Sequence, residues 1–222
     1  RSTNSKTGSE GFLTGSPRNG FVGRYIPPPA FHTFDPIAKS PSELLGGIAS
    51  SFEGRHEVLL GMVNEKANLP DLEEGEAPEM DAATILLICI LDWQEGGGAP
   101  RPLDSGHSRE RLGRFPSNDG NAVDYILNYT KEDDGEMHPL LRKLGSGLQG
   151  SRDGTLDFSR GAGGVELMGW LGIEEVSQLR KAIEKGAWTV LSSEPHDGGV
   201  QDALRHLLVI LRAAGRRKCG VL

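Results

Sequence analysis

Apolar residues recur at helical spacing in several stretches of the chain, and the clearest of these lies near its end. From Val200 to Ala214 apolar residues occupy positions i, i+3, i+4, i+7, i+8, i+11 and i+14, which form one face of an α-helix. A second amphipathic helix is predicted after Gly172, with Gly186 ending it and Gly215 ending the last helix. The residues of the second helix that we expect to face the core are Ile173, Val176, Leu179 and Ile183.

A helical hairpin is predicted in the first third of the chain. Ser40 suits the N-cap of a helix, Pro41 suits its first position, and Glu43 completes a capping-box pattern. The apolar spacing then continues to Gly54, where the helix is expected to end. A second helix is predicted over residues 55–67. The short separation of the two helices indicates that they pack antiparallel.

The segment from Ala82 to Trp93 is apolar nearly all round, so it is expected to be buried. Asp81 is placed to cap it. Its length favours a helix, whereas its β-branched residues leave a strand as the alternative. Those β-branched residues are Thr84, Ile85, Ile88 and Ile90.

The rest of the pattern alternates short helices with short strands and loops. Helices are predicted over 121–129 and from Pro139 to about residue 148, and strands over 155–158, 188–191 and 221–222. Residues 71–80 read as an acidic loop, and residues 96–121 as a Gly- and Pro-rich loop. The predicted fold class is therefore α+β, a mainly helical compact domain with a few short strands.

Domain boundaries follow from the same pattern. Residues 38–222 are predicted to form a single domain with a loop-rich insertion near 96–121. Residues 1–37 form an extended Gly-, Ser- and Pro-rich arm, with a short strand over 20–26. Phe31, His32 and Phe34 are expected to pin this arm to the domain.

Composition supports a soluble globular chain. Leu, Ile, Val and Phe together make up 54 of the 222 residues, above the roughly 20% below which chains stay disordered. The longest apolar run, Ile85–Leu91, is much shorter than the ~20 residues of a membrane-spanning helix, and no secretory signal is visible. Two cysteines, Cys89 and Cys219, do not form a disulfide framework, so a reducing, cytoplasmic location is expected.

Charge is the first feature that points to function. The chain carries 24 basic and 31 acidic residues, a net charge of −7, which argues against nucleic-acid binding. Seven acids and one lysine lie between Glu65 and Asp81. We expect this acidic stretch to be a surface on which a basic protein partner docks, because complementary charge speeds and orients encounter. A solvated loop is the alternative. The predicted partner-binding residues are Asp71, Glu73, Glu74, Glu76, Glu79 and Asp81.

Patterns for cofactors and metals are weak, and none is predicted. The glycine loop Gly161–Glu166 follows a predicted strand, but Glu166 would repel a phosphate. The His196–Asp197 pair lacks companion ligands at metal-binding spacing. The acidic run 132–136 lacks the alternating ligands of a calcium loop. No catalytic signature is present, so the chain is predicted to be non-enzymatic.

Two further functions stay open at this point. One is a hydrolase whose Asp, Glu and His residues are assembled by the fold, and a pocket holding His138 or His196 against carboxylates would favour it. The other is a lipid-anchored peripheral protein, because Cys219–Leu222 has the form of a prenylation box with basic residues upstream. Cys219 would carry the lipid.

The last fifty residues resemble small bacterial toxin-immunity proteins and neighbouring uncharacterised families. The resemblance lies in Trp170–Val176, Leu179, the terminal helix from Ala203 to Ala214, and Arg216–Leu222. It covers under a quarter of the chain and includes no chemical motif. The resemblance implies a cytoplasmic, non-catalytic protein that binds another protein.

Overall fold

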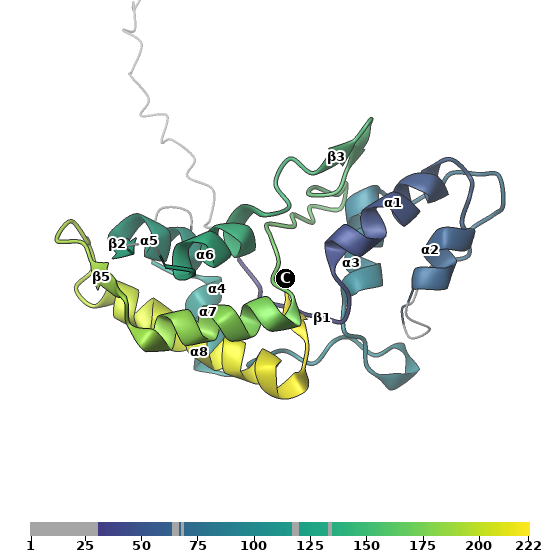
Figure 1. The fold of residues 1–222 in the computed structure, drawn as a ribbon. Helices are drawn as coiled ribbons and strands as arrows, with labels where there is room; N and C mark the ends of the chain where they lie inside the picture. Colours follow the sequence, from purple (N-terminus) through teal and green to yellow (C-terminus); the bar gives the residue numbers. More distant parts are fainter. Residues whose placement is uncertain (1–30, 64–66, 68, 117–119, 133–134) are drawn as a thin grey trace, which may run out of the picture.

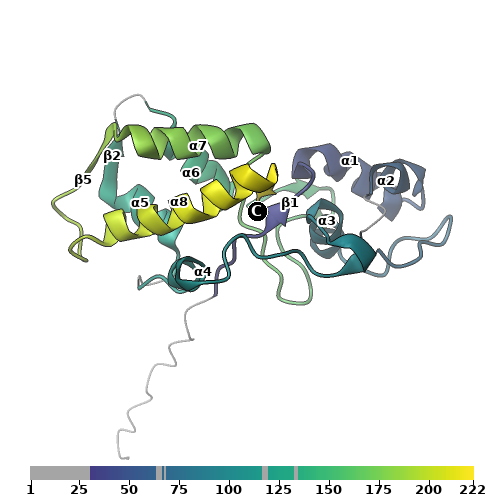
Figure 2. The same cartoon turned by 90° about the horizontal axis from the view of Figure 1, so that it is seen from below.

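The computed structural model of the 222-residue chain describes residues 31–63, 67, 69–116, 120–132 and 135–222. These residues form eight α-helices and six short strands, which confirms the predicted α+β, mainly helical fold class. Figures 1 and 2 show two groups of helices side by side, with α1–α3 in one group and α4–α8 in the other. The predicted strand over residues 20–26 lies outside the described residues.

The first group is a helical hairpin whose first helix also packs against a buried third helix. Helices α1 (Pro41–Phe52), α2 (Glu57–Met62) and α3 (Ala82–Ile90) share a hydrophobic cluster. The predicted hairpin is confirmed, since α1 packs against both α2 and α3. The largest fully buried side chains of these helices are Leu44, Ile48, Leu59, Ile85, Leu86 and Ile90.

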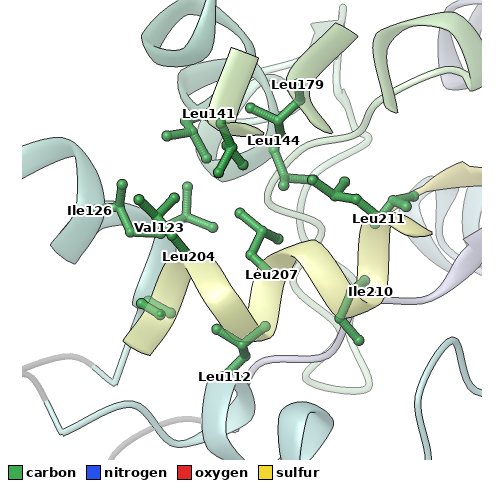
Figure 3. Packing of buried hydrophobic residues seen from close by; sticks show 14 of the residues in the cluster. Leu112, Val123, Ile126, Leu141, Leu144, Leu179, Leu204, Leu207, Ile210 and Leu211 are labelled. Atoms are coloured by element: carbon green, nitrogen blue, oxygen red, sulfur yellow. The ribbon is translucent and has the colours of Figure 1, made fainter. Parts of the chain in front are cut away.

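The second group is built around the long helix α8 (Gly199–Arg217). Its predicted apolar face packs on α5 (Ala122–Tyr129), α6 (Met137–Ser146) and α7 (Ile173–Lys185), while α4 (His107–Gly113) covers another side. Figure 3 shows the leucines of α8 interlocking with those of its neighbours. The residues of this contact include Leu204, Leu207, Leu211, Leu141, Leu144 and Leu179.

The strands are short and pair in antiparallel twos. β1 (Pro36–Ile37) pairs with β6 (Gly220–Val221), β2 (Thr130–Glu132) with β5 (Trp188–Val190), and β3 (Arg152–Asp153) with β4 (Leu156–Asp157). The β1–β6 pair places the start of the described chain beside its end. Ile37 of β1 also forms an isolated β-bridge with Leu91. β1 therefore lies where the two groups of helices meet (Figure 2).

The aromatic residues before β1 hold this segment to the second group, as predicted. Phe34 packs against the hydrophobic cluster of α4–α8, and the His32 amide donates to the carbonyl of Gly113. The Arg114 guanidinium lies 5.3 Å from the centre of the Phe31 ring.

Several predicted element boundaries are wrong. Residues 96–121 are not all loop, because a one-turn 3-10 helix forms at Glu95–Gly97 and α4 forms where Leu112 packs against α8. α2 covers only Glu57–Met62 of the predicted 55–67. α3 ends at Ile90, where Leu91 turns to extended backbone.

Predicted helix ends also shift in the second half of the chain. α8 continues past Gly215 to Arg217, and Lys218 caps it in the left-handed conformation. α6 begins at Met137, before Pro139, because the Glu132 carboxylate accepts the amide protons of Met137 and His138.

Two side chains depart from their predicted roles. The Ser40 hydroxyl contacts that of Ser42, so the side-chain cap expected with Glu43 does not form. Ile173, predicted to face the core, is 52% exposed, because it is the first residue of α7 and lies beyond the α7–α8 contact.

Candidate functional site

The acidic stretch predicted over Glu65–Asp81, taken together with the residues from Glu53 that precede it, holds the whole net charge of the chain. Nine acids and two basic residues lie between Glu53 and Asp81, so this stretch alone has a charge of −7. The remainder of the chain carries 22 acids and 22 basic residues and is neutral overall. It follows that the electrostatic field around the molecule is centred on the α1–α2 hairpin and the loop that leads to α3.

Residues 71–80 are the acidic loop predicted from the sequence. Its carboxylates point into solvent, and none of the ion pairs among the described residues involves them. These exposed carboxylates are Asp71, Glu73, Glu74, Glu76 and Glu79. Some carboxylates elsewhere are paired with arginines, for example Asp202 with Arg111 and Arg205. The acidic loop is therefore a run of five exposed carboxylates that make no ion pair within the described part of the chain.

The acidic loop is fixed at two points to the hairpin beneath it. The His56 ring is buried, with Nδ1 2.6 Å from the Ser51 hydroxyl and Nε2 2.9 Å from the carbonyl oxygen of Glu73. The Gly75 amide donates to the carbonyl of Gly54 at 3.1 Å. A loop held in this way loses little conformational freedom on binding, which favours recognition by a preformed surface.

Asp81 differs from the other predicted binding residues, because its carboxylate is used within the fold. Oδ1 accepts the Thr84 amide proton at 2.8 Å, and Oδ2 contacts the Thr84 hydroxyl and the Ala162 amide. Partial burial alone would raise the pKa of Asp81, but these hydrogen bonds hold its pKa below the usual value. Asp81 thus caps α3, as predicted, and joins it to the glycine loop that begins at Gly161.

A shallow furrow of about 570 Å³, with polar as well as apolar surface, adjoins the acidic loop. Leu60 stands at its edge with its side chain 54% exposed, although it lies on a helix of the core hairpin. The sequence did not indicate that Leu60 is exposed, because its spacing also fits the core face of the longer helix predicted over 55–67. The other described residues that line the furrow are Val63, Ala67, Leu69, Pro70, Asp71 and Leu72.

The histidines on which a hydrolase site was predicted are held in structural contacts. The His138 Nε2 lies 2.7 Å from the Thr130 hydroxyl, and burial lowers the pKa of this ring. The His196 ring stacks on Tyr125, whose hydroxyl donates to Glu194 at 3.1 Å. Glu194 in turn accepts the amide proton of Val200 at the start of α8, so it serves as a helix cap.

The structure brings together one serine–histidine–aspartate group that the sequence did not reveal. The Ser108 hydroxyl lies 2.8 Å from His206 Nδ1, and Asp202 lies 3.5 Å from Nε2. Ser108 and His206 are both buried, and burial lowers the pKa of the His206 ring. Because the serine is covered by α4 and α8 and its aspartate is paired with two arginines, this group joins the two helices and offers no exposed nucleophile.

The predicted glycine loop forms a turn closed by the β-bridge between Arg160 and Glu166. The Glu166 carboxylate pairs with the Arg160 guanidinium at 2.9 Å, which leaves a charged pair where a phosphate would have to lie. Among the described residues no cluster of three or more His, Cys, Asp or Glu side chains could hold a metal ion.

Both cysteines are buried thiols. Burial raises the pKa of Cys89 to about 11 and also raises the pKa of Cys219. The residues after Cys219 form strand β6, which pairs with β1. Prenylation at Cys219 would therefore require the end of the chain to leave this pairing, and the lipid-anchor hypothesis stays a prediction.

Comparisons with known proteins add no relative: no protein-family model matches the chain, and neither a curated protein nor a solved structure is significantly similar to it. Within the described part of the chain, no helix has the length and apolar character needed to cross a membrane.

Proposed function

We propose that this chain is a non-enzymatic protein-binding module that engages a basic partner through the acidic loop. The observation that carries the proposal is the uncompensated charge of this loop. Five exposed carboxylates stand together with no ion pair among the described residues, whereas the chain outside residues 53–81 is balanced in charge. Complementary charge on a partner raises the association rate and fixes its orientation.

The attachment of the loop supports the same role. A loop that served only as a solvated connection would not need the buried His56 ring and the Gly54–Gly75 contact that hold it. Fixed carboxylates recognise a partner at a lower entropic cost than mobile ones. The resemblance of the last fifty residues to toxin-immunity proteins agrees with this role, because it implies binding to another protein without catalysis.

The proposal is tested by capturing partners from native lysate with three forms of the tagged full chain. These are the wild type, the loop-reversed variant Glu73→Lys/Glu74→Lys/Glu76→Lys, and the control variant Glu110→Lys/Glu136→Lys/Asp197→Lys. The control changes the net charge equally, at exposed acids outside the acidic loop. Circular dichroism verifies that all three forms are folded.

We expect the wild type and the control to retain one stoichiometric basic protein, and the loop-reversed variant to lose it by about tenfold or more. The retention should also weaken as salt rises, because exposed charges are screened. Capture of the same partner by the loop-reversed variant would show that the acidic loop is not the binding surface.

A further inference from the structure

We propose that a cavity between the two groups of helices binds an organic amine with an apolar body, and that the Asp35 carboxylate holds its ammonium group. The cavity has a volume of about 480 Å³, which falls in the usual range of small-molecule sites. No residue of the acidic loop lines it, so this site is independent of the proposed function. The observation that carries the proposal is a carboxylate on a wall that is more apolar than polar, with no ion pair among the described residues.

Both groups of helices contribute to the cavity. Leu87 of α3 lines it from the first group, and Val123 of α5 and Leu144 of α6 line it from the second. The segment that leads into β1 and residues 164–169 supply further walls. All of these stretches belong to the described part of the chain. Ligands are often bound at such places, where two packed units meet.

Backbone hydrogen bonds fix the walls of the cavity. The Asp35 amide donates to the Leu222 carbonyl at 3.1 Å, and the Leu222 amide donates to the Asp35 carbonyl at 2.9 Å. In another wall, the Leu167 amide donates to the Ser159 carbonyl at 2.8 Å. A ligand that enters a preformed site costs less ordering of the chain, which favours binding of a small molecule.

Asp35 determines which charge the ligand should carry. Its carboxylate is partly buried and accepts the Thr33 hydroxyl at 2.8 Å. The other side-chain carboxylate on the wall, Glu166, is already paired with Arg160. The described residues that line the cavity include no lysine or arginine. An ammonium group beside Asp35 therefore gains a favourable charge interaction, whereas an anionic ligand is repelled.

Aromatic side chains next to Asp35 in the chain suit the same class of ligand. Phe34 is partly buried and Phe31 is 46% exposed, and both line the cavity. Aromatic faces attract ammonium groups and also pack against apolar bodies. The Arg114 guanidinium lies 5.3 Å from the centre of the Phe31 ring, so this ring already accepts a cation. An amine with an apolar body thus matches the cavity in both charge and polarity.

The experiment measures the affinity of three probes for the full chain by isothermal titration calorimetry. Tryptamine, tryptophol and indoleacetate are similar in size and carry a positive charge, no charge and a negative charge. The wild type is compared with Asp35→Asn, which keeps the size of the side chain, and with Met168→Trp, which places a larger side chain in the wall. Asp153→Asn is the matched control, because it removes an exposed carboxylate outside the cavity.

We expect tryptamine to bind the wild type about tenfold more tightly than tryptophol, and indoleacetate to bind most weakly, because only the amine is attracted to Asp35. Asp35→Asn should lower the affinity for tryptamine to that for tryptophol, whereas Asp153→Asn should leave the order unchanged. Met168→Trp should weaken binding of tryptamine and tryptophol alike, because the cavity loses volume.

Three results would overturn the proposal. Equal affinity of tryptamine and tryptophol for the wild type, or a preference for tryptamine that survives Asp35→Asn, would show that Asp35 does not hold an ammonium group. Unchanged binding by folded Met168→Trp would place the probes outside the cavity. The Asp35→Asn result decides the proposal even if Met168→Trp does not fold. Because none of these variants changes the acidic loop, the proposed function stands or falls separately.

Discussion

Asp81 is the residue at which the predicted site and the observed fold differ most. It belongs by sequence to the acidic stretch, but its carboxylate accepts three hydrogen bonds from Thr84 and Ala162. The neighbouring acids, Glu79 and Glu76, make no such contacts among the described residues and stay exposed. The Asp81 carboxylate therefore serves the N-cap of α3, while the partner-binding role of the whole predicted set stays a prediction.

Removing this cap should lower the free energy of unfolding by an amount that depends on pH. Asp81→Ala is expected to lower the free energy of unfolding at neutral pH by about 0.5–2 kcal/mol, the usual value of a helix N-cap. Since the pKa of Asp81 is lowered in the folded chain, its carboxylate stabilises the fold above the unfolded value of 3.8, and this contribution disappears as the pH falls through the folded pKa.

Urea unfolding of Asp81→Ala and of the wild type, at neutral and at strongly acidic pH, measures this contribution. Asp153→Ala serves as control, because Asp153 is exposed in β3. A difference between Asp81→Ala and the wild type that stays constant down to the lowest pH would contradict the role of the ionised carboxylate.

Elements with one clear apolar face could be predicted well from the sequence. α5 and α7 appear close to their predicted ranges, and α8 differs mainly by its longer end. α4 was missed because its sequence offers one leucine, Leu112, among charged residues, and its helix depends on packing against α8. Local spacing does not reveal a helix that tertiary contact stabilises.

Contacts between distant elements could not be predicted at all. The His56 ring meets the Glu73 carbonyl across 17 residues, and Gly54 meets Gly75 across the same loop. Nothing in the local pattern at either end indicates its partner. The acidity of the candidate surface could thus be predicted from the sequence, whereas its attachment and the neighbouring furrow could not.

The Gly54–Gly75 contact gives a prediction for the hairpin and its loop. Gly54 has a φ of 81°, and a Cβ there would lie 2.7 Å from the carbonyl carbon of Gly75. Gly54→Ala should therefore destabilise the chain by both backbone strain and steric clash. Gly75→Ala provides the control, because Gly75 has a φ of 85° but open space around its Cβ position.

We expect Gly75→Ala to cost about 1–2 kcal/mol of unfolding free energy, which is the strain of a left-handed residue, and Gly54→Ala to cost clearly more. Urea unfolding monitored by circular dichroism gives both values. Equal losses for the two variants would show that the close approach of Gly54 to Gly75 does not hold the loop.

On the scale of the whole molecule, packing and charge are distributed differently. Hydrophobic clusters occupy both groups of helices, and β1 and β6 join the two ends of the described chain where the groups meet. The net charge, in contrast, lies on the α1–α2 hairpin and the acidic loop alone. The prediction of one domain over residues 38–222 stays a prediction.

This asymmetry is the reason for proposing that a basic partner binds at the acidic loop. We would test this by titrating the ¹⁵N-labelled full chain with a lysine peptide and measuring the amide chemical shift of every residue at each step. We expect shift changes to concentrate in residues 71–80 and to weaken at high salt. Changes centred on α4–α8, with the acidic loop unaffected, would contradict it.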